Sequence, residues 1–543
     1  MKLRVAAWIA LAGGVSMFGA AVTAEQQAGT AQQQGGTAQQ QGGTAQQQAA
    51  RVDYGNRQAS QVKYLKASNP GEDDKIGIGD PLVGVTLAMS DDGRTIAVST
   101  PHEDSVATGI NGKQDDESAW DSGAAYIFVK TGDTWMQQAY LKASNTQTSD
   151  KFGFAIAISG DGNTAAVSAT LEDSNARGIN GNQQDNSAES SGAVYVFVRT
   201  GATWTQQAYV KASNADAGDQ FGWSVALNHD GSTLAVGAQS EASGASSING
   251  NQADNEAADA GATYVYVRRG TTWTQQAYIK ASNAQGGDRF GFCAALSGDG
   301  NTLAVCGYDE DGGATGINGP QNNDAGGSGA AYVFVRRGTA WSQEAYVKPS
   351  NTHPNEAFGS ALALSADGNT LAVNAADEDS LSRGIDGDQS SVPVNEGSAG
   401  AVYVYGRTNG VWMQQAYVKS FNIGPIDLFG VRLALSRDGS VLAAGAPGQS
   451  GAGHGINPYP HDLSVHESGA VYVFTRTAGK WSQNAYLKAP NSEEYDQLGG
   501  GVAISGDGAT VAASSNGEDG GSKGAAGDQH DNSLRDSGAV FVF

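Results

Sequence analysis

The sequence has little positive charge, few recognisable enzyme motifs and little helical periodicity. Each of these shortages excludes a class of fold or function. Lysine and arginine make up 32 of its 543 residues against 56 acids, for a formal net charge of −24. A chain with that balance repels nucleic acid and anionic membrane surfaces. No serine nucleophile motif, phosphate loop or dinucleotide fingerprint occurs. No repeated segment shows helical periodicity, so strands are expected throughout.

Cysteine is also scarce, and both residues, Cys293 and Cys306, fall in one predicted hairpin. If Asp299 and Gly300 are its central turn residues, the two thiols face each other across antiparallel strands. An exported location favours a disulfide, whereas two small residues filling core positions would remain free thiols. Both alternatives stay open, and neither indicates thiol catalysis.

Repetition is what the chain has in abundance. A glycine followed by an apolar, β-branched and aromatic run recurs about every 69 residues, at Gly123, Gly192, Gly261, Gly329, Gly400, Gly469 and Gly538. An Asp-Gly hairpin signal is also present in all seven copies. Each copy resolves into four strands, which in the second copy are residues 152–159, 163–169, 193–199 and 204–212. Such a period indicates units that bury one another's faces.

Four antiparallel strands repeated seven times predict an all-β fold, a seven-bladed β-propeller of four-stranded antiparallel blades. The last copy stops at Phe543, after its third strand, and residues 61–69 match the missing fourth strand. We therefore predict a propeller domain over residues 61–543. Its ring is closed by N-terminal strand 61–69, which completes the C-terminal blade.

The repeats resemble the FG-GAP repeat family, the propeller type also found at the head of integrin alpha subunits. The name-giving pair stands at Phe152-Gly153, Phe221-Gly222, Phe290-Gly291, Phe358-Gly359 and Phe429-Gly430. The resemblance implies the fold and leaves activity open, because propellers host binding proteins and enzymes alike. Integrin-type repeats commonly carry an Asp-rich calcium loop that residues 159–163 do not match, so that site is not carried over.

The N-terminal region predicts export. Lys2 and Arg4 precede an apolar stretch that ends in small residues at Val22-Thr23-Ala24, so residues 1–24 are predicted to be a signal peptide. A membrane anchor is the alternative; cleavage is favoured and would leave no integral membrane segment. Residues 25–60, rich in Gln, Gly, Thr and Ala, predict a disordered linker. We expect a monomer of the exported bacterial type that is secreted, periplasmic or at the cell surface.

Charge is predicted to divide between the two faces of the disc. One face holds the loops between second and third strands and the crossovers between blades, and both are acidic: Glu172, Asp173, Asp185 and Glu189 in the first, and Asp150, Asp219, Asp288, Asp427 and Asp496 in the second. The opposite face is predicted to carry a basic ring that includes Arg199, Arg268, Arg336, Arg407 and Arg476.

Two other repeated residue types are better explained by structure than by function. We expect one lysine of the outermost strand to block edge-to-edge association with its charge; it stands at Lys66, Lys142, Lys211, Lys280, Lys348, Lys419 and Lys488. The tryptophans at the start of the fourth strand are expected to be packed structural residues, at Trp135, Trp204, Trp273, Trp341, Trp412 and Trp481.

The long loops are the candidates for function. Several contain a Gly-Ile-Asn-Gly core followed by acids, and carboxylates on such turns suit calcium, the candidate cofactor. The candidate ligands are Asp115, Asp116, Asp185, Asp254 and Asp324. The alternative is an ordinary solvated loop, which has the same composition.

The sixth loop breaks the pattern and holds three of the chain's seven histidines. Its candidate ligand-binding residues are His454, Tyr459, His461, Asp462 and His466. A His/Asp group could bind a transition metal or act as acid and base, whereas the alternative is a variable surface loop. We assign no catalytic residue.

The sequence therefore predicts an exported or cell-surface binding and adhesion propeller that recognises a glycan or an extracellular protein through acidic loops, without catalysis. The alternative is a secreted propeller enzyme, a lyase or hydrolase acting on polysaccharide through the sixth loop. A surface-coat or spacing protein without a dedicated ligand is a third possibility.

Overall fold

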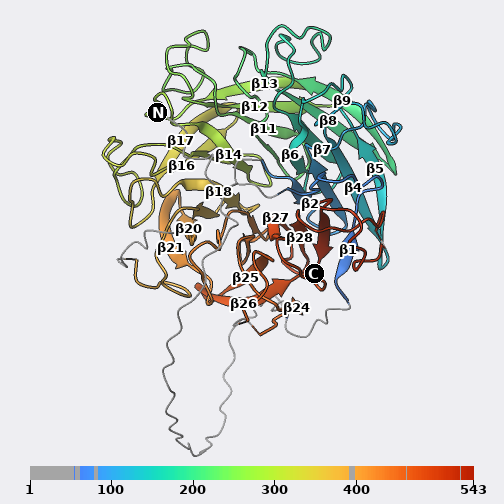
Figure 1. The fold of residues 1–543 in the computed structure, drawn as a ribbon. Helices are drawn as coiled ribbons and strands as arrows, with labels where there is room; N and C mark the ends of the chain where they lie inside the picture. Colours follow the sequence, from blue (N-terminus) through green and yellow to red (C-terminus); the bar gives the residue numbers. More distant parts are fainter. Residues whose placement is uncertain (1–53, 55–60, 79–83, 390–397, 460–461, 526) are drawn as a thin grey trace, which may run out of the picture. The chain divides into compact units, whose positions relative to one another are not determined.

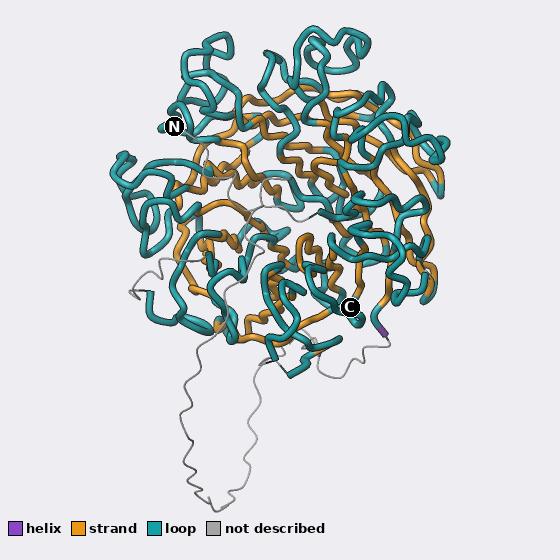
Figure 2. The backbone as a smooth tube through the Cα atoms, in the orientation of Figure 1, coloured by secondary structure: helices purple, strands orange, loops and turns teal. Residues whose placement is uncertain are grey.

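The computed structural model describes residue 54 and residues 61–78, 84–389, 398–459, 462–525 and 527–543. Apart from Tyr54, the predicted signal peptide and linker lie outside the described residues. One compact unit spans Val52–Phe543. Apart from 3₁₀ geometry at Tyr54 and Gln61, its described part contains strands and loops and no α-helix, as the sequence predicts (Figure 2).

Seven antiparallel sheets stand around a common centre (Figure 1). The first four blades are β2 (Leu87–Met89), β3 (Thr95–Thr100), β4 (Ala124–Thr131) and β5 (Thr134–Leu141); β6 (Phe152–Ile158), β7 (Thr164–Ala169), β8 (Ala193–Thr200) and β9 (Thr203–Val210); β10 (Ser224–Leu227), β11 (Thr233–Ala238), β12 (Ala262–Arg269) and β13 (Thr272–Ile279); β14 (Phe290–Leu296), β15 (Thr302–Gly307), β16 (Ala330–Arg337) and β17 (Ala340–Val347).

The remaining blades are β18 (Phe358–Leu364), β19 (Thr370–Ala375), β20 (Ala401–Thr408) and β21 (Val411–Val418); β22 (Leu433–Leu435), β23 (Val441–Ala446), β25 (Ala470–Thr477) and β26 (Lys480–Lys488), with β24 (Gly455–Ile456) added; and β27 (Leu498–Ile504), β28 (Val511–Ser515), β29 (Ala539–Val542) and β1 (Lys63–Leu65). The first strands contact one another around the ring, from β2 to β6, β10, β14, β18, β22, β27 and back to β2, so they line the central channel.

A belt of backbone hydrogen bonds closes the ring at the turns between first and second strands. The bonds, at 2.8–3.0 Å, run from Asp91 N to Gly160 O, Asp161 N to His229 O, His229 N to Gly298 O, Gly298 N to Ala366 O, Ala366 N to Arg437 O, Arg437 N to Gly506 O and Gly506 N to Asp91 O. Because the last bond returns to the first blade, the array is a closed ring and not an open solenoid.

The N-terminal strand completes the last blade, as predicted. β1 pairs antiparallel with β29, with Tyr64 opposite Phe541, and the sheet order is β1-β29-β28-β27. The two rings lie 5.5 Å apart. In Figure 1 the blue β1 therefore lies beside the red strands of the C-terminal blade.

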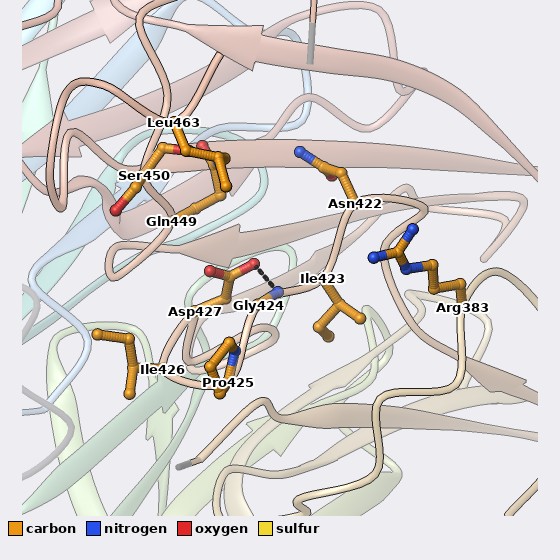
Figure 3. Close-up of a pocket in the computed structure, with 10 residues that line it drawn as sticks. All are labelled: Arg383, Asn422, Ile423, Gly424, Pro425, Ile426, Asp427, Gln449, Ser450 and Leu463. Atoms are coloured by element: carbon orange, nitrogen blue, oxygen red, sulfur yellow. Dashed lines mark hydrogen bonds between the residues drawn. The ribbon is translucent and has the colours of Figure 1, made fainter. Parts of the chain in front are cut away.

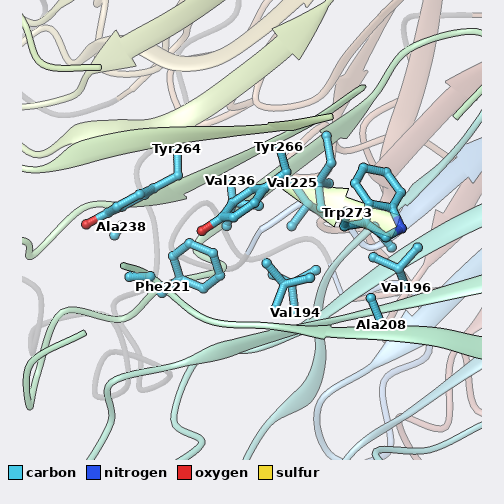
Figure 4. Packing of buried hydrophobic residues seen from close by; sticks show 14 of the residues in the cluster. Val194, Val196, Ala208, Phe221, Val225, Val236, Ala238, Tyr264, Tyr266 and Trp273 are labelled. Atoms are coloured by element: carbon cyan, nitrogen blue, oxygen red, sulfur yellow. The ribbon is translucent and has the colours of Figure 1, made fainter. Parts of the chain in front are cut away.

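The hydrophobic cores lie between successive blades, and the Phe-Gly pair helps to form them. The Phe221 ring meets Tyr264 and Tyr266 edge-on, with centroids 5.4 and 6.2 Å away, beside Val194 of the preceding blade (Figure 4). Gly222 has φ +100°, and a Cβ there would lie 2.7 Å from the Cβ of Ser168 in the preceding blade. Glycine thus permits the close approach of the two blades.

Candidate functional site

The recurring lysine is buried, so its predicted role as a guard of the blade edge is wrong. Lys211 is 0% exposed, and its Nζ lies 2.9 Å from Glu172 Oε2. Tyr209 and Asn145 donate hydrogen bonds to Oε1 of that glutamate, at 2.8 and 3.0 Å. The equivalent ion pairs are Lys66–Glu518, Lys142–Glu103, Lys280–Glu241, Lys348–Glu310 and Lys419–Glu378. The lysine is tolerated in the interior because a carboxylate pairs with it.

The Gly-Ile-Asn loops protect the blade edges instead. Ile179 forms a bridge to Val210 on the outermost strand. Asn180 N donates to Tyr209 O at 2.8 Å, and Tyr209 N donates to Asn180 Oδ1 at 2.9 Å. In the sixth blade the same segment extends into β24, which pairs with β26. This motif therefore has a structural task, since it covers the unpaired edge of a sheet.

Several acids assigned to the acidic face are buried, and the prediction is wrong at those positions. Glu172 is in the ion pair described above. Asp150 is 3% exposed and accepts a hydrogen bond from Gln147 N at 3.0 Å, while burial raises the pKa of Asp150 to about 8. The acids that accept the same turn hydrogen bond in the other crossovers are Asp74, Asp219, Asp288, Glu356, Asp427 and Asp496.

The tryptophans are structural, as predicted. Trp204 is buried and donates from Nε1 to Gln138 Oε1 of the preceding blade at 2.9 Å. The Arg199 guanidinium stacks over its ring at 5.4 Å. The same stacking joins Arg268 to Trp273, Arg336 to Trp341, Arg407 to Trp412 and Arg476 to Trp481. These arginines therefore pack on their own blades.

The predicted calcium ligands occupy separate blades, apart from the neighbours Asp115 and Asp116. Asp116, Asp185 and Asp254 each accept a hydrogen bond from a backbone N–H two residues on, at 3.1 Å. Asp324 accepts one from Asn322, and Asp115 is exposed. Within the described ranges, no three His, Cys, Asp or Glu side chains gather where they could hold a metal ion. Calcium binding stays a prediction.

The sixth loop presents its described candidates to solvent. His454 and His466 are exposed, and Tyr459 is 75% exposed. Asp462 is exposed and accepts a hydrogen bond from Ser464 N at 3.1 Å, the same turn that Asp185 makes in the second blade. His461 lies outside the described residues. Ligand binding by this loop stays a prediction.

Cys293 and Cys306 lie on the neighbouring strands β14 and β15. The strand register shifts between Phe290 and Ala294, which places Cys293 in the irregular part of the pair. Both thiols are free, and Cys293 Sγ donates to Gly359 O of the next blade at 3.1 Å. Burial raises the pKa of the Cys306 thiol. The disulfide stays a prediction.

One side of the channel mouth carries four aromatic residues that sequence reasoning missed. Phe154, Trp223 and Phe292 each follow the glycine of a Phe-Gly pair, and successive ring centroids lie 4.7 and 5.8 Å apart. Tyr308, at the start of the β15–β16 loop, stacks on Phe292 at 4.5 Å and 21°. We call these four residues the aromatic arc. All but Phe292 are partly exposed.

The arc spans the second to fourth blades and is absent from the equivalent positions of the others. Those positions hold Val85, Ser360, Val431 and Gly500. The mouth is therefore asymmetric, with aromatic side chains on one side and small or aliphatic residues on the other. Alignment of the residue that follows each Phe-Gly pair would have found this signal.

Polar groups border the arc. Trp223 N donates to Gln220 O, and the Gln220 side chain accepts a hydrogen bond from Gln239 Nε2 at 3.1 Å. Gln239 Oε1 is buried without a hydrogen-bond partner. Beside Tyr308, Asp309 Oδ2 lies 3.3 Å from Arg289 Nε in a half-exposed ion pair. Such groups next to apolar rings can orient a polar ligand.

A family model matches the chain at three segments, which together cover about a third of it. The model for the FG-GAP repeat matches residues 135–197, 204–266 and 273–334, which each run from the fourth strand of one blade to the third strand of the next. The chain carries FG-GAP repeats. The resemblance carried by the Phe-Gly pairs is confirmed, and the four residues of the arc lie within the matched segments of this FG-GAP propeller.

Other comparisons add little to that finding. No curated protein sequence matches the chain. Hydrazine synthase of Kuenenia stuttgartiensis aligns at 12% identity and a TM-score of 0.43, over 80% of this chain and 94% of that one. The periplasmic gluconolactonase PpgL of Pseudomonas aeruginosa aligns at 15% identity and a TM-score of 0.39, over 76% and 86%. At such TM-scores these likenesses carry no argument about the FG-GAP propeller.

In the described part of the FG-GAP propeller, no helix has the length and hydrophobicity needed to cross a bilayer.

Proposed function

We propose that this FG-GAP propeller is an exported binding protein that recognises a glycan at the aromatic arc and does not convert it chemically. The observation that carries the proposal is the row of rings formed by Phe154, Trp223, Phe292 and Tyr308 at the channel mouth. Export is proposed from the signal-peptide pattern of residues 1–24.

The aromatic faces of the arc and the polar groups at its edge suit the binding of a sugar ring. Aromatic faces offer a large, rigid apolar area to the C–H faces of a pyranose. The Gln220–Gln239 pair and the Arg289–Asp309 pair offer hydrogen-bond donors and acceptors for hydroxyl groups at the same edge. A glycan of several rings fits a row better than a single sugar does, because successive rings can occupy successive aromatic faces.

The experiment is a glycan array probed with the full chain, with and without a chelator. Trp223→Ala removes the central ring of the arc, and Trp120→Ala is the matched control because Trp120 is 65% exposed on a first-blade loop. We expect retention of at least one glycan class, loss of that retention in Trp223→Ala and its survival in Trp120→Ala. Equal retention by both variants would refute the arc as the site.

Two readouts in the same experiment separate the alternatives. Loss of retention with chelator would support a calcium contribution, whereas unchanged retention would contradict one. Shortened products released from the retained glycan would contradict a non-catalytic protein and favour the enzyme. If Trp223→Ala does not fold, Phe154→Leu removes the first ring while keeping an apolar side chain, and it should also weaken retention.

A further inference from the structure

The sixth blade lacks the buried carboxylate that the other six blades share. Gln449 occupies the position of the glutamate, and Lys488 is still 0% exposed. Lys488 Nζ donates to Gln449 Oε1 at 3.3 Å, to Ser468 Oγ at 2.6 Å and to Gly469 O at 2.6 Å. All three acceptors are neutral. Because the ammonium has no counter-ion in contact, burial lowers the pKa of Lys488 to about 7.

The same replacement leaves an amide donor unpaired. In the second blade Asn145 Nδ2 donates to Glu172 Oε1 at 3.0 Å, and Asn214 Nδ2 does the same to Glu241 Oε1 at 2.9 Å. The equivalent Nδ2 of Asn422 is buried without a hydrogen-bond partner, although its Oδ1 accepts from Tyr472 at 2.7 Å. An unpaired buried donor destabilises the folded chain, and a ligand oxygen at this position would supply the missing hydrogen bond.

A cavity of about 210 Å³ lies beside these groups, lined by Asn422 and Gln449 (Figure 3). Arg383, an exposed residue of the fifth-blade loop, contributes a guanidinium to the lining. The apolar lining comes from Ile423, Pro425, Ile426 and Leu463. Figure 3 shows the side-chain nitrogen of Asn422 directed towards the loop that holds Gln449.

One carboxylate, Asp427, also lines the cavity. Its Oδ2 accepts a hydrogen bond from Gly424 N at 2.7 Å, so it is engaged in the crossover turn. Burial raises the pKa of Asp427 to about 6. Asp427 therefore loses its charge at a higher pH than a solvated carboxylate does, and it opposes an incoming anion less.

We propose that this cavity binds a small carboxylate ligand. The carboxylate accepts hydrogen bonds from Asn422 Nδ2 and the Arg383 guanidinium, while the carbon skeleton packs on Ile423, Ile426 and Leu463. The ligand thereby supplies the sixth blade with the negative charge that a glutamate supplies in the other six. The site is separate from the aromatic arc and does not depend on glycan binding there.

A carboxylate can come from an aliphatic acid or from a uronic acid, and calorimetric titration of the full chain distinguishes them. The probes are 3-methylbutanoate and galacturonate, each compared with its neutral counterpart, 3-methylbutanamide and galactose. We expect one of the two acids to bind, and its neutral counterpart to bind at least about tenfold more weakly, as expected for the loss of a charge-assisted hydrogen bond. No binding by either acid would overturn the proposal, and so would equal binding by the neutral partner.

Gln449→Glu tests the same site from the protein side. It restores the glutamate of the other blades, so it should pair with Lys488 and Asn422 and weaken carboxylate binding by at least about tenfold. Gln184→Glu makes the same change at an exposed position of the second-blade loop and should leave binding unaltered. Equal binding by the two variants would contradict the proposal. If Gln449→Glu fails to fold, Asn422→Leu removes the donor at similar size and should also weaken binding by at least about tenfold.

Discussion

Lys66 Nζ lies 3.2 Å from Glu518 Oε2, and this buried ion pair joins two residues 452 positions apart in the sequence. Lys66 directly follows β1, and Glu518 lies in the loop between β28 and β29. Tyr64 also donates to Glu518, at 2.8 Å. The contacts that fix each lysine inside its own blade therefore fasten the N-terminal strand to the last blade and help to close the ring.

Glu518→Gln should weaken that closure. Removal of one partner leaves the Lys66 ammonium buried without its counter-ion, which typically costs about 3 kcal/mol or more. We expect a fall of that size in the free energy of unfolding measured with urea. The control is Glu256→Gln, an exposed acid on the third-blade loop, which should change stability little. Equal stability of the two variants would show that the ion pair does not support the ring.

Because the acids of the crossovers are buried, we expect the folded chain to be more stable at acidic pH than at neutral pH. Burial raises the pKa of Asp219 from 3.8 to about 7, so the folded state binds its proton more tightly than the unfolded state does. Its contribution is fully present below about pH 4 and is lost as the pH rises through about 7. The free energy of unfolding should therefore decrease between these values. Asp219→Asn should flatten the decrease, while Asp259→Asn, at an exposed loop position, should not.

For Lys488 we expect the opposite pH dependence: its contribution to the free energy of unfolding should rise at higher pH, whereas that of Asp219 falls. Its folded pKa of about 7 lies below the ordinary value of 10.5, so the unfolded state binds more protons between these limits. The Lys488 contribution to stability therefore rises with pH from about 7 to about 10, by at most about 1.4 kcal/mol per pH unit. Subtracting the urea curves of Lys488→Met from those of the parent chain should reveal this rise. Lys480→Met, at an exposed site, should show no such difference.

The sixth-loop histidines should be dispensable for glycan retention. His454 and His466 are exposed and lie in a different blade from the aromatic arc. The double variant His454→Ala, His466→Ala is therefore expected to retain glycans on the array as the parent chain does. A loss of retention that matches Trp223→Ala would move the binding site to this loop.

The ring could be predicted from the sequence because its signals repeat. The Asp-Gly turns and the apolar runs recur in register, and residues 61–69 match a strand that the last copy lacks. Because the same strand pattern occurs in seven copies, the prediction of the fold does not depend on any single strand. The pairing of Tyr64 with Phe541 confirms the prediction that the N-terminal segment supplies the strand that the last copy lacks.

The roles of the repeated charges could not be predicted in the same way. A lysine that recurs once per blade is compatible with an exposed edge and with a buried ion pair, because recurrence does not reveal which way a side chain points. The deciding partner of Lys211 is Glu172, which lies 39 residues away in the sequence and which the sequence pattern places on the acidic face. Gln449, which breaks that series, and Trp223, which differs from Val431 at the same position, could have been found by aligning the copies.

The most direct test of the account is a structure of the full chain bound to the glycan that it retains best on the array. We expect sugar rings over Phe154, Trp223 and Tyr308, with hydroxyl groups within hydrogen-bond distance of Gln220 or Asp309. A glycan seated on the sixth-blade loop or on the outer edge of a blade, with the arc unoccupied, would contradict it.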